Sequence, residues 1–137
     1  MREIIFRGKR VDNGEWVYGY LSKSRWINRQ LELCIDYEEK GVMCSSIVIP
    51  ETIGQYTGLK DNNGTRIFEG DIISKNYDES EIPFISCCVQ FKYGEFELIN
   101  HHSGKLLFIS HACRGKIVGN IHDNPELIEE QDNESTL

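Results

Sequence analysis

Two histidine-containing segments hold the residues whose types could do chemistry. His101 and His102 are adjacent, and His111 and Cys113 follow ten residues later. Imidazole and thiolate groups are good zinc ligands, but this spacing matches no standard zinc pattern. On a strand, His101 and His102 would also point to opposite faces. We therefore interpret these residues as polar groups of the surface or of a hairpin loop, and predict neither a metal nor a cofactor.

Catalytic groupings are equally weak in this chain. His111 and Cys113 would share one face of the strand expected there, as a Cys-His pair could, but no recognised nucleophile motif surrounds them. Glu69 and Asp71 are two carboxylates that flank Gly70. We favour a turn in which Asp71 accepts hydrogen bonds from backbone amides. The chain is therefore expected not to be an enzyme.

A basic and aromatic segment is the strongest candidate for binding. It contains Lys23, Arg25, Trp26 and Arg29. Lysine and arginine can neutralise phosphate, and a tryptophan can stack on a base. The alternative is a solvated hairpin with Trp26 in the core or in a subunit contact. We favour that alternative, because the whole chain carries a net charge of −7, which opposes binding to a polyanion.

The charge is unevenly distributed along the sequence. Residues 1–29 hold seven Lys or Arg against three acids, whereas the remainder is strongly acidic. Nucleic-acid binding by the basic N-terminal lobe therefore stays open as the second function.

The cysteines and the hydropathy pattern indicate the compartment. The five cysteines are an odd number with no CxxC pair, and no secretory signal precedes them, so reduced thiols are expected. Cys87 and Cys88 are adjacent, and one of them is expected to be buried, since neighbours on a strand face opposite ways. No apolar run has the length needed to cross a bilayer. The sequence predicts a cytoplasmic protein with no membrane contact.

Dense turn signals and short apolar segments indicate β structure in the first part of the chain. Asp12-Asn13-Gly14 is expected to form a type I′ hairpin turn. It would join a strand at Ile4–Arg7 to a second strand, in which Trp16, Tyr18 and Tyr20 share one face. Two further strands are expected at residues 31–35 and 46–49.

The second part of the chain continues the same pattern. Residues 50–58 show no period and are expected to be irregular, and Asp61–Gly64 is expected to form a tight turn. A proline that follows Asn124 indicates a short C-terminal helix. The polar run at 129–137 is expected to be disordered. Strands are expected to begin at Gly70 and to cover residues 87–93, 96–100, 105–110 and 116–121.

Four segments carry a more specific pattern: REIIFR at 2–7, VIPETIGQYTGLKD at 48–61, GTRIFEGDII at 64–73 and VGNIHDNPEL at 118–127. Together they span nearly the whole chain and resemble the YopX family of phage and prophage proteins. The resemblance implies a fold that includes a barrel related to SH3-like barrels. It implies no catalytic residues and no established molecular role.

These observations combine into one expected architecture, which is mainly β. Residues 1–49 are expected to form an N-terminal antiparallel β lobe. Residues 50–128 are expected to form a lobe with a small SH3-like barrel, from about 65 to 122, and a short C-terminal helix. An acidic tail, 129–137, completes the chain.

The expected function is that of a phage or prophage accessory protein. It would act as a non-enzymatic interaction module through contacts with an unknown protein partner, and as a homo-oligomer. Open sheet edges must be covered, charged or paired, and aromatic residues with arginine are enriched in interface centres. The N-terminal lobe is therefore expected to make the contact, in which the candidate residues are Trp16, Tyr18, Lys23, Arg25, Trp26 and Arg29.

Overall fold

The computed structural model describes residues 3–25, 30–75, 85–101 and 103–128. The chain divides into two compact units, Met1–Tyr56 and Thr57–Leu137, and each is described by itself. The sequence placed this boundary after Ile49. In the structure the boundary lies after Tyr56, because Gly54 and Gln55 pair with the first strand. The tail expected at 129–137 lies outside the described residues.

The first unit contains β1 (Phe6–Lys9), β2 (Trp16–Arg25), β3 (Leu31–Glu39), β4 (Val42–Ile47), the 3-10 turn η1 (Pro50–Thr52) and the start of β5 (Gly54–Lys60). The strands are antiparallel, in the order β4-β3-β2-β1-β5. The segment after β4 returns to β1, where Val48 bridges Arg10 and the amide of Ile49 donates to the carbonyl of Lys9 at 2.8 Å.

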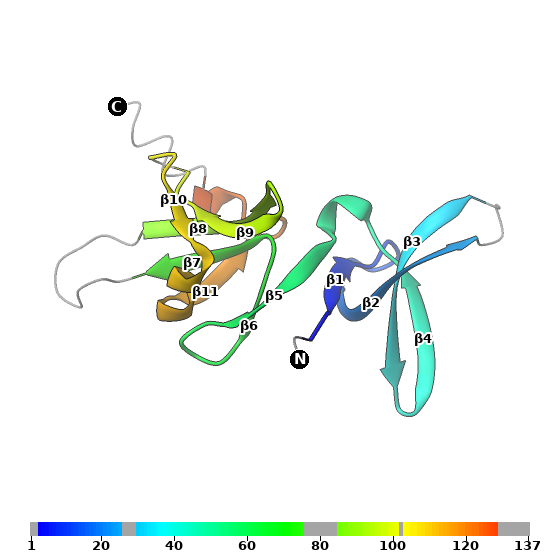
Figure 1. Cartoon of the computed structure of the whole chain (residues 1–137). Helices are drawn as coiled ribbons and strands as arrows, with labels where there is room; N and C mark the ends of the chain where they lie inside the picture. The colour runs from blue at the N-terminus through cyan, green and yellow to red at the C-terminus, as the bar shows by residue number, and fades with distance from the viewer. Residues whose placement is uncertain (1–2, 26–29, 76–84, 102, 129–137) are drawn as a thin grey trace. The chain divides into compact units, whose positions relative to one another are not determined.

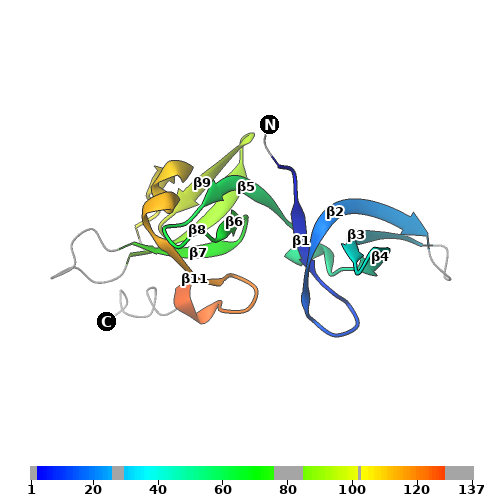
Figure 2. The same cartoon turned by 90° about the horizontal axis from the view of Figure 1, so that it is seen from below.

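β2 changes partner near its middle, as Figures 1 and 2 show. Residues from Trp16 to Gly19 pair with β1, and residues from Tyr20 to Arg25 pair with β3. Gly19 lies at the change of partner. In this unit, Ile35 and Val48 are almost wholly buried.

The hairpin turns differ from the sequence-based expectation. The prediction of a type I′ turn at Asp12-Asn13-Gly14 is wrong, because Gly14 is the one residue of the three with a positive φ, at 72°. Arg10 and Glu15 instead close a longer loop. Paired positive φ angles, as type I′ requires, occur at Lys40-Gly41 and at Tyr93-Gly94.

The expectation of irregular structure at residues 50–58 is also wrong. After η1, β5 runs from the first unit into the second. Its start pairs with β1 through Gln55 and Gly54, and its later part lies beside β6, where Thr57 Oγ1 donates to the carbonyl of Ile67 at 2.8 Å. The two halves pack in different surroundings, so no single apolar period marks the strand.

The second unit contains β6 (Arg66–Phe68), β7 (Asp71–Lys75), β8 (Ile85–Lys92), β9 (Glu95–Ile99), β10 (Leu106–Phe108), the 3-10 helix η2 (Ile109–Arg114) and β11 (Lys116–Asn120). Its main sheet is antiparallel, in the order β10-β9-β8-β7-β11. Within the described chain neither sheet closes on itself, so the SH3-like barrel is not confirmed, whereas the mainly β class is. Residues 126–128 are helical, as expected for the C-terminal helix.

The core of the second unit lies on one face of its sheet. Ile67, Ile73, Val89, Leu98 and Ala112 form a buried cluster together with Cys87. Cys88 on the opposite face is buried as well. The expectation that one of the two neighbouring cysteines would be buried is therefore wrong, because both faces of β8 are covered at this point. In the part of the chain that the structure describes, no helix is long and apolar enough to span a bilayer.

Candidate interaction surface

An aromatic row lies on one face of β2. Trp16, Tyr18 and Tyr20 alternate along the strand and share that face. The register of β1 places Lys9 directly opposite Trp16 and Arg7 directly opposite Tyr18. We call these five residues, Arg7, Lys9, Trp16, Tyr18 and Tyr20, the aromatic face.

Arginine and lysine hold the tryptophan of this face in place. The guanidinium carbon of Arg7 lies 4.6 Å from the centre of the Trp16 ring, and Lys9 Nζ lies 5.7 Å from it. Both distances are within the range of cation–π attraction. Arg7 is buried, so its charge is held against the ring beneath the surface. The two cations therefore hold the Trp16 ring in a fixed position on the aromatic face.

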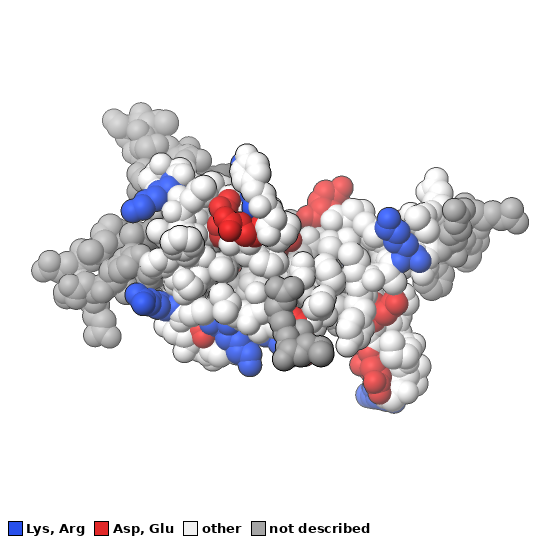
Figure 3. All heavy atoms as spheres, in the orientation of Figure 1, with Lys and Arg blue, Asp and Glu red and all other residues white. Residues whose placement is uncertain are grey.

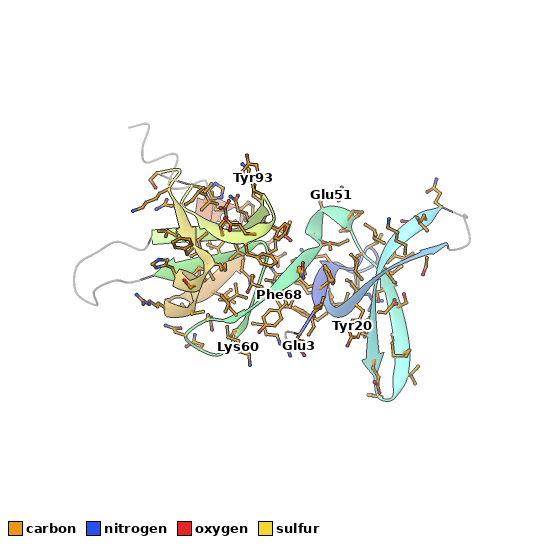
Figure 4. The ribbon with its side chains drawn as sticks, in the orientation of Figure 1. Glu3, Tyr20, Glu51, Lys60, Phe68 and Tyr93 are labelled. Carbon is orange, nitrogen blue, oxygen red and sulfur yellow. The ribbon has the colours of Figure 1, made fainter. Side chains whose placement is uncertain are left out.

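Tyr18 and Tyr20 extend the aromatic face into solvent. Their side chains are 48% and 65% exposed, respectively. Figure 4 labels Tyr20 on β2. The opposite side of β1 is packed, because a Cβ atom on Gly8 would lie 3.0 Å from Val48. The two tyrosines are therefore the exposed part of the aromatic face, and Arg7 is its buried part.

The structure separates the candidate residues that the sequence grouped together. Trp16 and Tyr18 lie on the aromatic face, but Lys23 pairs with Leu33 and belongs to the opposite face of β2. The side chain of Arg25 and the whole of Trp26 and Arg29 lie outside the described residues. On the face that Figure 3 draws, acidic and basic side chains of the described N-terminal unit are interspersed, rather than forming a continuous basic strip.

The histidine and cysteine candidates are placed differently from their prediction. β10 ends at Phe108, so His111 and Cys113 lie in η2 and not on a strand. The prediction that they share a strand face is therefore wrong; in η2 they flank Ala112, which is fully buried in the core. His101 is exposed, and His102 lies outside the described residues. Among the described residues, no group of three or more His, Cys, Asp or Glu could hold a metal ion.

Asp71 has the turn role that the sequence favoured. It is buried, and the backbone amide of Phe68 donates to its Oδ2 atom at 2.7 Å. The turn between β6 and β7 passes through Gly70, which has a φ of 94°. The carboxylate thus stabilises the entry to β7.

Thiol labelling of the native chain is expected to separate two classes of cysteine. Burial, and to a lesser extent the charge of Asp71, raises the pKa of the Cys88 thiol to about 12. A disulfide reagent at about pH 8 should label two of the five thiols quickly and the others only after denaturation, because the thiolate is the reactive form. Rapid labelling of three or more would contradict this packing. The accessible pair is Cys44 and Cys113, and the buried thiols are Cys34, Cys87 and Cys88.

The sequence predicted the aromatic row but not the two cations, Arg7 and Lys9, that lie beside it. The period-two spacing of Trp16, Tyr18 and Tyr20 was sufficient to place them together. Arg7 and Lys9 lie beside these aromatic residues because of the register between β1 and β2. The sequence does not fix that register, because the length of the loop between the two strands is uncertain. Alternation of Arg7 and Lys9 along β1 was the one available signal.

The chain matches the family model described as "YopX protein" over residues 5–129. No curated protein sequence matches it. The crystal structure of protein EF1440 from Enterococcus faecalis is similar, with a TM-score of 0.55 and 21% identity, over 93% of this chain and 99% of that one. The crystal structure of yopX from Bacillus subtilis has a TM-score of 0.56 and 18% identity, over 93% of this chain and 97% of that one. These likenesses support the fold, and the match of the family model over most of the sequence shows that the chain belongs to the YopX family.

Proposed function

We propose that this chain is a phage- or prophage-encoded accessory protein that acts as a non-enzymatic interaction module. It binds a partner protein through its aromatic face. The observation that carries this proposal is the pair of exposed tyrosines, Tyr18 and Tyr20, beside the fixed stack of Arg7 on Trp16. Tyrosine, tryptophan and arginine are the residue types that contribute most to binding energy at protein interfaces.

The physical form of the aromatic face favours protein contacts. A tyrosine has two side-chain torsions, so it provides a large contact area at a small cost in conformational entropy. Each aromatic residue lies on a paired part of β2, since Trp16 and Tyr18 pair with β1 and Tyr20 pairs with β3. A partner would therefore meet a preorganised surface.

A capture experiment tests the proposal. The immobilised chain is incubated with lysates of lysogenic or phage-infected bacteria, and bound proteins are quantified by mass spectrometry. Proteins enriched on the wild type should fall by roughly tenfold or more on a Tyr18→Ala/Tyr20→Ala double variant. Tyr93→Ala is the matched control, since Tyr93 is a 91% exposed tyrosine of the other unit and its variant should capture as the wild type does.

Two outcomes would contradict the proposal. The first is equal capture of the same proteins by the wild type and the double variant. The second is retention of the chain on heparin at modest salt, which would favour the nucleic-acid alternative; an acidic interaction module is expected to flow through.

A further inference from the structure

β4 is the terminal strand of its sheet, and the printed backbone contacts cover its outer edge only at Ile47, beside Val11. Its six residues, VMCSSI, include no charge, proline or glycine, and its register with β3 is unbroken from Val42 to Ile47. Val42 and Met43 are 62% and 66% exposed. Natural proteins usually block such an edge with a charge, a proline or a bulge, because an open edge pairs with another strand.

The hydrogen bonds around β4 show which of its backbone groups face outward. The amide of Val48 donates to the carbonyl of Leu33 in β3, whereas the carbonyl of Ile47 accepts from Val11 on the other side. Backbone groups alternate in direction along a strand. Met43 and Ser45 therefore direct their N–H and C=O groups away from β3, as Ile47 does.

We infer that β4 pairs with β4 of a second copy of this chain, in antiparallel register about a two-fold axis at Cys44. In this register Met43 of one copy lies opposite Ser45 of the other, so the two outward-facing residues satisfy each other. Each such pair exchanges two N–H···O bonds, and the symmetry doubles them. The edge is thus complementary to itself without any change in the strand.

This dimer gives the expected homo-oligomer a defined contact in the N-terminal unit. It uses the edge of the sheet and leaves the aromatic face, on β1 and β2, open to a partner. Two linked copies would present two aromatic faces, which raises the avidity for a partner that is itself multivalent. That consequence rests on the proposed function, whereas the pairing of β4 does not.

Cys44 reports on the register directly. At the two-fold axis the two Cys44 residues form a non-hydrogen-bonded pair, whose Cα atoms lie about 4.5 Å apart in antiparallel sheets. A disulfide can span that separation. Mild oxidation with diamide, which takes up the two electrons and two protons of the thiols, should therefore give a cross-linked species of twice the 15.8 kDa chain mass. Cys44→Ser should abolish it, and Cys113→Ser should not.

Sedimentation equilibrium at tens of micromolar tests the same contact without oxidation. The wild type should be a dimer. Met43→Pro, which removes an outward N–H donor, should weaken dimerisation by roughly tenfold or more, and Met43→Ala should retain it. Circular dichroism checks that the proline variant is folded. If the proline variant is unfolded, the Cys44 cross-link of the wild type still tests the pairing of β4.

A monomeric wild type, a cross-link that survives Cys44→Ser, or unchanged dimerisation of folded Met43→Pro would overturn the pairing. The outcomes for the two proposals are separable. A monomer that still loses its captured proteins in the Tyr18→Ala/Tyr20→Ala variant would refute the dimer alone. A Cys44-linked dimer whose capture is unaffected by that variant would refute the aromatic face alone.

Discussion

Replacing Gly19 with alanine is expected to destabilise the N-terminal unit by about 3 kcal/mol, because a side-chain carbon has no room there. A Cβ atom on Gly19 would overlap the backbone oxygen of Asp36 and would lie 3.3 Å from Ile35 Cγ2. Asp36 is in β3, opposite Tyr20. Backbone of a paired strand cannot move aside as a flexible side chain can, so β2 and β3 would separate at the point where β2 changes partner.

Urea unfolding followed by circular dichroism measures this effect. Gly14→Ala is the matched control, because nothing lies within 4 Å of a Cβ atom there and the cost comes from the φ of 72° alone. That cost should be about 1 kcal/mol. Equal losses in the two variants would show that the close approach at Gly19 does not constrain the strand.

Replacing Asp61 with alanine is expected to cost the second unit about 3 kcal/mol, because it leaves three backbone amides without their acceptor. Asp61 is buried. Its Oδ1 atom accepts from the amides of Asn63 and Thr65, each at 2.9 Å, and its Oδ2 atom accepts from the amide of Ile117 at 3.0 Å. The last bond ties the turn before β6 to β11.

The same carboxylate predicts a dependence of stability on pH. Burial alone would raise the pKa of Asp61, but the amides of Ile117, Thr65 and Asn63 outweigh it and lower the pKa below the ordinary value of 3.8. A lowered folded-state pKa stabilises the folded chain above the unfolded value. This contribution is lost as the pH falls through the folded-state pKa.

Unfolding free energies of the wild type and of Asp61→Asn, measured from neutral pH into the acid range, test this prediction. The asparagine variant keeps the size of the side chain but cannot ionise, and one of its side-chain atoms is a donor. Its deficit should be largest near neutral pH and should shrink at acid pH. A deficit that stays constant across that range would assign the effect to packing instead of charge.

Local patterns predicted many of the strands but not the segments whose geometry depends on distant partners. The alternation in residues 31–35 was sufficient to place β3, and the aromatic period was sufficient for β2. β5 was missed, because each half packs in different surroundings and no period survives. η2 was missed as well: its apolar residues continue the run of β10, and the burial of Ala112 in the core decides the change of structure.

The same distinction separates what was predicted of the candidate surfaces. Trp16 and Tyr18 could be grouped from spacing alone. Lys23 was grouped with them by proximity in the sequence, but strand alternation places it on the other face. The outward direction of Met43 and Ser45 depends on which carbonyl receives the amide of Val11, and no pattern within β4 specifies that.

Site-specific photo-crosslinking in bacterial cells that express the chain tests the central claim most directly. A photoreactive phenylalanine analogue replaces Tyr20 in one strain and Tyr93, in the second unit, in another. The proposed function predicts a discrete protein adduct from position 20 that survives nuclease treatment, and no matching adduct from position 93. Position 20 without an adduct, or with one that nuclease removes, would contradict a module that acts through protein contacts at its aromatic face.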